Sequence, residues 1–155
     1  MNDFFRFEAE FADSLRCIPM QVRYKLDTCG IKLKLPQWNR FSTEDRYQLL
    51  KQPCRTPEEV QSYKSFLQQL IAAKTGEMAT ELPIDTAPDW QNDATIPDSV
   101  QEKAKEVGVC LTLAQWVVLS PIQRFALIKL SRSSHENRNF LPALKEFQVA
   151  STYPV

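Results

Sequence analysis

The chain has 155 residues, 43% of them hydrophobic and 25% charged, which is the balance of a soluble protein long enough to bury a core. Its 19 basic and 19 acidic residues cancel, so we expect neither a nucleic acid nor a membrane surface as partner. Three glycines and one histidine are too few for phosphate-binding loops or for most metal sites. We therefore predict a protein that is not an enzyme and holds no cofactor or metal.

The N-terminal segment, residues 1–18, is predicted to form an amphipathic helix because apolar side chains recur along it at helical spacing. These side chains are Phe4, Phe7, Phe11, Leu15 and Ile18. Charged residues interrupt the segment, so it does not resemble a secretory signal, and no stretch of the chain approaches the roughly 20 apolar residues of a membrane helix. We expect a cytoplasmic protein whose four cysteines stay reduced.

Residues 19–51 and 97–129 match each other when the chain is shifted along itself by 78 residues. Of the 33 aligned positions 12 are identical, where composition alone would give about two. Such self-similarity is the signature of tandem duplication. We predict an all-α fold of two helical units, residues 19–74 and 97–150, joined by an acidic linker over 75–96 and packed as one globular domain.

Each unit is predicted to contain the same elements in the same order. A first helix lies between a proline and a glycine, which suit the start and the end of a helix. A short extended link, a short helix carrying the tryptophan of an LxLxQW motif and two further helices follow. The first unit has helices over about 19–29, from Pro36, over 43–51 and over 57–74; the second has them over about 97–107, after Thr112, from Pro121 and over about 136–150. No alternating run is long enough to predict a sheet.

The linker over 75–96 contains prolines and five acidic residues but no lysine or arginine. We expect a solvated connection that packs Trp90 and Leu82 onto the units. The alternative is an acidic strap that a partner binds. Both possibilities fit the composition.

For the single residues whose side chains could carry out chemistry, the sequence indicates structural roles. Trp38 and Trp116 occupy matched positions, which is typical of a core residue repeated in two copies. The only histidine, His135, lies in the polar sequence SRSSHENRN, and a single imidazole in such a loop is expected to be a surface residue rather than a catalytic one. Cys29 is matched by Val107, so a small apolar core residue is expected there.

The most informative difference between the two units is in the side chains that follow the tryptophan. The first unit carries Asn39, Arg40 and Glu44, which are polar or charged and thus predicted to face solvent. The matched residues of the second unit are Val117, Val118 and Ile122. We therefore predict an apolar surface on the second unit that binds a partner, with the N-terminal Phe4, Phe7 and Phe11 either covering it or joining it.

Two segments carry a resemblance to a known family. Residues 7–38, which include LRCIP and LDTCGIKLKLPQW, and residues 108–128 are similar to the nitrate reductase-associated protein family of cyanobacteria. The resemblance implies a small cytoplasmic protein, encoded near genes for nitrate reductase and molybdopterin synthesis, that supports nitrate reductase activity. It implies no catalytic residue.

Two functions remain open from the sequence. The favoured hypothesis is a non-enzymatic accessory or maturation factor that docks onto nitrate reductase or onto its cofactor-delivery machinery. The alternative is a carrier of the molybdenum cofactor, with Cys17 or Cys29 near the metal. Its phosphate contacts would come from the basic stretch that contains Arg16, Arg23, Lys25, Lys32 and Lys34. The scarcity of glycine weighs against it, because phosphates also need backbone N–H groups.

Overall fold

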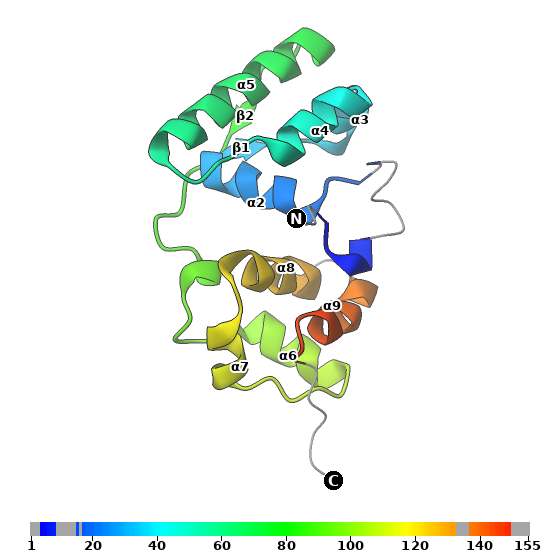
Figure 1. The fold of residues 1–155 in the computed structure, drawn as a ribbon, viewed down its shortest axis with the longest axis vertical. Coiled ribbons are helices and arrows are strands. Elements are labelled where there is room, and N and C mark those ends of the chain that lie inside the picture. The colour runs from blue at the N-terminus through cyan, green and yellow to red at the C-terminus, as the bar shows by residue number, and fades with distance from the viewer. Residues whose placement is uncertain (1–3, 9–14, 16, 133–136, 150–155) are drawn as a thin grey trace. The chain divides into compact units, whose positions relative to one another are not determined.

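The computed structural model describes residues 4–8, 15, 17–132 and 137–149, and these are mostly helical, as predicted. The chain divides into two compact units, one built from Met1–Phe4 and Glu8–Asp85 and the other from Phe5–Phe7 and Thr86–Val155 (Figure 1). In chain order the elements are η1 (Arg6–Glu8), α2 (Met20–Cys29), β1 (Ile31–Lys32), α3 (Leu35–Asn39), α4 (Thr43–Lys51), α5 (Pro57–Thr75), β2 (Thr80–Glu81), η2 (Asp89–Gln91), α6 (Asp98–Glu106), α7 (Leu113–Val118), α8 (Pro121–Arg132), η3 (Asn137–Asn139) and α9 (Phe140–Glu146).

The first unit is organised around α2, which packs against α4 and α5, while α3 packs against α5. Trp38, Tyr63 and Leu67 are fully buried in one apolar cluster that these helices share. The Tyr63 hydroxyl donates to the Leu49 carbonyl at 2.8 Å, and Lys25 Nζ donates to two carbonyls just beyond it, those of Leu50 and Gln52. These side chains satisfy the carbonyls at the end of α4, which its own helix leaves without donors.

Two helix starts of the first unit were predictable from local sequence. Before α4, the Ser42 hydroxyl accepts from the Asp45 amide and the Asp45 carboxylate accepts from the Ser42 amide, both at 3.0 Å. Before α5, Thr56 and Glu59 form the same reciprocal pair. Each pair satisfies two amides that lack partners inside the helix, which confirms the predicted starts of α4 and α5.

The structure adds a small sheet that the sequence analysis did not predict. Residues Ile31–Lys32 of the expected extended link form β1, which pairs antiparallel with β2 in the linker. Beyond the pair, the Leu82 amide donates to the Gly30 carbonyl at 2.8 Å. The first half of the linker is therefore attached to the first unit by backbone hydrogen bonds.

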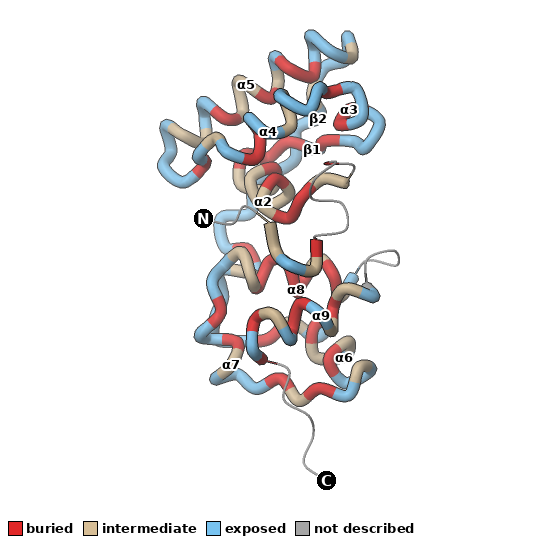
Figure 2. The backbone as a smooth tube through the Cα atoms, turned by 45° about the vertical axis from the view of Figure 1, so that its right-hand side comes forward, coloured by how far each residue is buried: buried red, intermediate tan, exposed pale blue. Residues whose placement is uncertain are grey.

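The second unit is organised around α8, which is buried along most of its length (Figure 2). It packs against α6 and α9 and against the short turns η2 and η3. Trp90 of η2 meets the Phe125 ring edge-on, with centroids 5.0 Å apart, which confirms the expected packing of Trp90. The second half of the linker thus packs against α8 of the second unit.

Matched elements of the two units begin 78 residues apart. This holds for α2 and α6, for α3 and α7, and for α4 and α8. Gly30 and Gly108, which follow the first helix of each unit, both have a left-handed backbone with φ of 75°. Trp38 and Trp116 are both completely buried, as predicted.

Both chain ends depart from the predicted helices. In the N-terminal segment, Arg6–Glu8 form a 3-10 turn rather than part of an α-helix, and Leu15 has a left-handed backbone with φ of 52°. The remainder of that prediction falls on residues outside the described ranges. Near the C-terminus, the helix expected over about 136–150 is shorter, because η3 precedes it and Phe147 ends it. His135 also lies outside the described residues.

Candidate functional site

Val117 and Val118 of the predicted apolar surface lie on α7, a short helix whose position is fixed by hydrogen bonds on its buried side. The Trp116 indole N–H donates to the Asn92 carbonyl at 3.0 Å. Arg124 is 6% exposed, and its guanidinium donates to four carbonyls, those of Trp90, Trp116, Val117 and Leu119. Because Arg124 satisfies the free carbonyls at the end of α7, the helix is fixed in position without a charged group on its outer side.

The outer side of α7 is apolar and accessible. Val118 is 78% exposed and Val117 is 46% exposed, so the structure places these two predicted site residues at the surface. Ile122, at the start of α8, is only half-buried and contributes less. Leu113 is 47% exposed on the same helix and was not among the predicted site residues. We call Leu113, Val117 and Val118 the α7 face.

The first unit positions α3 in the same manner. The Trp38 indole N–H donates to the Leu15 carbonyl at 2.8 Å, and Arg46 donates to the same carbonyl and to that of Asn39. The Arg46 guanidinium also lies over the Trp38 ring, 5.5 Å from its centre. Here too the exposed side of the helix begins with a leucine, since Leu35 is 51% exposed.

The described N-terminal phenylalanines pack in other places: Phe4 in the first unit, and Phe5 and Phe7 beside α9 of the second. Phe4 packs against the apolar cluster of the first unit. Phe7 stacks on Phe5 and meets the ring of Phe147, which follows α9. Figure 1 shows α7 and α9 well apart within the second unit. Phe11 lies outside the described residues.

Some of the basic residues considered for cofactor phosphates already bind carbonyls of the fold. Arg23 Nε donates to the Ile18 carbonyl at 2.9 Å, and Lys25 is engaged at the end of α4. Lys32 and Lys34 are exposed on and after β1, and Arg16 lies outside the described residues. Two of the five cations are therefore committed to backbone carbonyls inside the fold.

The two buried thiols are poorly suited to metal binding or to nucleophilic chemistry. Burial raises the pKa of Cys29 to about 12 and that of Cys54 to about 11, so both thiols stay protonated at neutral pH. Cys17 and Cys110 are partly exposed free thiols. Among the described residues, no three His, Cys, Asp or Glu side chains gather in a way that would hold a metal ion.

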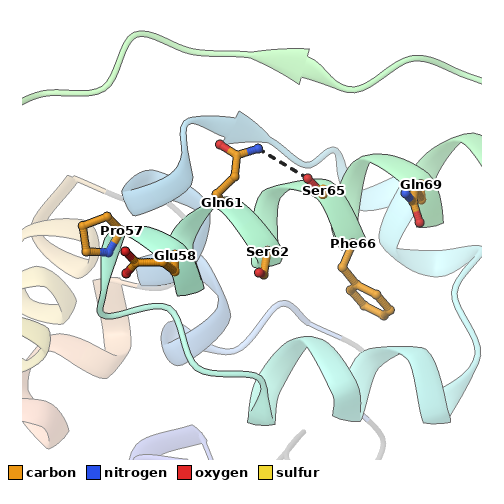
Figure 3. A pocket seen from close by; sticks show the side chains of 7 residues that line it. All are labelled: Pro57, Glu58, Gln61, Ser62, Ser65, Phe66 and Gln69. Atoms are coloured by element: carbon orange, nitrogen blue, oxygen red, sulfur yellow. Dashed lines mark hydrogen bonds between the residues drawn. The ribbon is translucent and has the colours of Figure 1, made fainter.

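One surface depression lies along α5, with a volume of about 730 Å³. All its lining residues come from that one helix, and the side chains drawn in Figure 3 carry a single charge, that of Glu58. Gln61 Nε2 donates to Ser65 Oγ at 3.4 Å, so part of its polar lining is already paired. The polar side chains of this depression do not converge on one point, so it would not hold a small molecule from several sides.

Comparisons with known proteins identify one family. Residues 4–147 match the model of the conserved nitrate reductase-associated protein family. Neither curated proteins nor solved structures gave a match. In the part of the chain that the structure describes, no helix has both the length and the apolar character needed to cross a bilayer. Because the match covers nearly the whole chain, the chain belongs to the conserved nitrate reductase-associated protein family.

Proposed function

We propose that this protein is a non-enzymatic accessory or maturation factor that supports nitrate reductase by docking through the α7 face. The observation that carries the proposal is a short helix with three exposed apolar side chains and a fully buried tryptophan behind them. Apolar side chains gathered on an accessible surface mark interaction sites, because a partner that covers them removes apolar area from water. The family name supplies the partner, nitrate reductase.

Rigidity supports this role. Because Trp116 and Arg124 already fix α7, docking would order little additional backbone and would lose little conformational entropy. The partner is nitrate reductase itself or a protein of its cofactor-delivery machinery, which we expect the protein to meet in the cytoplasm. Either partner would bury the same three side chains.

A carrier of the molybdenum cofactor has less support. Arg23 and Lys25, which would hold phosphates, already donate to carbonyls of the fold. The thiol of Cys29 donates to the Leu26 carbonyl and is buried with a raised pKa. Replacing Cys29 with valine, the residue at the matched position 107, should therefore leave the protein's function intact.

We also infer that the two units are copies of one ancestral helical motif. Three pairs of helices begin at the same offset, and each motif ends its first helix at a left-handed glycine. Both motifs hold the tryptophan helix with an arginine from the following helix. The domain bounds of 19–74 and 97–150, with an intervening linker, remain part of this proposal.

The experiment is an exchange of residues between the motifs. Val117→Asn with Val118→Arg introduces the side chains that the first unit carries at 39 and 40, and both positions are exposed, so folding should be preserved. The tagged full chain is used to capture partners from nitrate-grown cells of the source organism. We expect the wild type to retain nitrate reductase activity or a cofactor-delivery protein, and the exchange to reduce this at least tenfold, the size expected for central interface residues.

The matched control is Ala73→Arg, which adds the same charge at an exposed position of α5. It should capture partners as the wild type does. Circular dichroism and melting should be the same for all three proteins. Equal capture by the exchange variant would contradict the proposed role of the α7 face.

A further inference from the structure

The exposed side of α3 in the first unit is the structural counterpart of the α7 face but differs from it in charge. Leu35 is 51% exposed at the position that matches Leu113, and Pro36 beside it is exposed too. Lys34 precedes the helix and Arg40 follows it, where the second unit has Thr112 and Val118. An apolar centre is therefore bordered by cations in one unit and by neutral side chains in the other.

The border cations are available for binding. Within the described ranges, the side chains of Lys32, Lys34 and Arg40 make no hydrogen bond or ion pair, and all three are exposed. By contrast, Arg46 directs its guanidinium inward to the carbonyls of Leu15 and Asn39. The fold thus uses some of its basic residues internally and leaves these three around Leu35.

The neighbouring sheet shows what kind of chain this side of the unit accepts. The acidic, extended segment around β2 pairs with β1, and its Glu77 carboxylate accepts from Gln37 Nε2 of α3 at 2.7 Å. Glu81 pairs with Lys64 of α5 at 2.5 Å. Met78, between these contacts, is 91% exposed. An acidic segment is therefore already bound beside α3 in cis, through Gln37 and Lys64, while the exposed cations around Leu35 are left to other ligands.

We propose that Lys32, Lys34, Leu35, Pro36 and Arg40, the basic α3 face, form a second docking surface for an acidic segment of a partner protein. An apolar side chain of that segment packs on Leu35 and Pro36, and carboxylates on either side of it meet Lys34 and Arg40. Opposite charges around an apolar contact steer association and fix its register. With the neutral α7 face, the chain then has two docking surfaces of different chemistry, as an adaptor between two protein segments requires.

The alternative ligand, a phosphate group of a cofactor, fits these residues less well. A phosphate needs cations and backbone N–H groups but gains nothing from an exposed leucine and proline. The amide of Lys34 is already bonded to Gln37 Oε1 at 3.0 Å, and the Gln37 and Trp38 amides are bonded to the Lys34 carbonyl. Changing Leu35 therefore distinguishes the two ligands, because only the binding of a protein segment depends on this side chain.

The test uses the full chain labelled with ¹⁵N and three probes. The first probe is a synthetic peptide with a central leucine flanked by glutamates, the second has glutamine in place of every glutamate, and the third is inorganic pyrophosphate. Chemical shifts locate binding and titrations give the dissociation constants. We expect the glutamate peptide to shift amides of residues 32–40, to bind about tenfold tighter than the glutamine peptide, and to weaken as salt rises.

Two variants and one matched control identify the contacts. Leu35→Ala should weaken the glutamate peptide about tenfold, and so should Lys34→Thr with Arg40→Val, which takes the residues of the second unit. The control, Leu113→Ala, alters the matched leucine of the α7 face and should leave this binding unchanged. Because none of these probes is nitrate reductase, the result is independent of the proposed function.

Three outcomes would overturn the proposal. One is pyrophosphate binding as tightly as the glutamate peptide with no effect of Leu35→Ala, which would indicate a simple anion site. Another is a set of shifts that lies away from residues 32–40. The third is equal binding of the glutamate and glutamine peptides, since the cations would then play no part.

Discussion

The two units fix a short tryptophan helix in the same way and present different side chains on its outer surface. In both, the indole N–H donates to a carbonyl of the segment that precedes the first helix, Leu15 in one unit and Asn92 in the other. In both, an arginine of the following helix donates to the carbonyl of the residue directly after the tryptophan. That residue is Asn39 in the first unit and Val117 in the second. The buried side is the same, and the exposed side is basic in one unit and apolar in the other.

This difference separates residues that fold the chain from residues that act. Trp38 and Trp116 are identical because each must fill a core and satisfy an indole N–H. Arg40 and Val118 differ because nothing inside either unit depends on them. The outer residues of α3 and α7 are therefore the positions at which to look for partners.

The largest expected effect is loss of either tryptophan. Trp38→Ala and Trp116→Ala each remove a side chain that is 0% exposed, and each should lower the free energy of unfolding by about 3–5 kcal/mol. Chemical denaturation followed by a probe in each unit measures this. Trp90→Ala, which alters a half-buried ring, is the milder control. If either Trp38→Ala or Trp116→Ala lowered the free energy of unfolding by less than about 1 kcal/mol, α3 and α7 would not be equivalent in the two cores.

Replacing the arginines should affect the units unequally. Arg124→Met removes hydrogen bonds to four carbonyls, two of them buried and two part-buried, so we expect a cost of about 3 kcal/mol. Arg46→Met should cost about 1 kcal/mol, because Arg46 is less buried and donates to two carbonyls. Arg46 Nε is moreover buried without a hydrogen-bond partner among the described residues, whereas Arg124 Nε donates to Trp90. Equal costs measured by thermal unfolding would contradict this difference.

Elements coded by adjacent residues were predictable from the sequence. The start of α4 follows from Ser42 and Asp45, and the start of α5 from Pro57 at the first helical position. The burial of both tryptophans followed from their repetition. The exposure of Val117 and Val118 followed from comparing the two copies position by position.

Elements that depend on distant residues were missed. The alternation of Ile31, Lys32 and Leu33 was visible, but a strand also needs a partner, and β2 lies far along the chain in the linker. The N-terminal phenylalanines recur at helical spacing, yet Phe5 and Phe7 serve an aromatic cluster with Phe147. Leu113 was missed because it is identical to Leu35, and the apolar surface was predicted only from positions at which the two units differ.

Gly30 and Gly108, the left-handed glycines at matched positions, provide a smaller contrast. A β-carbon at Gly30 would lie 2.8 Å from both the Leu82 carbonyl oxygen and Ile84 Cγ1, whereas one at Gly108 would meet nothing within 4 Å. Gly108→Ala should cost about 1 kcal/mol, from the positive φ alone. Gly30→Ala should cost about 2 kcal/mol because it also displaces the segment after β2. Faster hydrogen exchange of the Leu82 amide in Gly30→Ala, but not in Gly108→Ala, would confirm the cause.

The smallest expected effect is a difference in response to acid between the starts of α4 and α8. Ser42 pairs with the carboxylate of Asp45, and Ser120 pairs in the same way with the neutral amide of Gln123. Desolvation opposes ionisation of Asp45, but hydrogen bonds from the Ser42 amide and hydroxyl and the nearby Lys74 outweigh it, so the pKa of Asp45 is lowered below 3.8.

Since the folded-state pKa of Asp45 is lowered, the ionised carboxylate stabilises the fold at neutral pH, and this stabilisation is lost as the pH falls through that lowered pKa. Hydrogen exchange at the Asp45 and Arg46 amides should therefore accelerate in acid more than exchange at the Gln123 and Arg124 amides, after correction for intrinsic rates. The difference should correspond to less than about 1 kcal/mol, as for other interactions at a helix start. Asp45→Asn keeps a hydrogen-bond acceptor but cannot titrate, so it should abolish the difference. If the difference persisted in Asp45→Asn, the acid response would come from another carboxylate of the first unit, and the two helix starts would be equivalent in this respect as well.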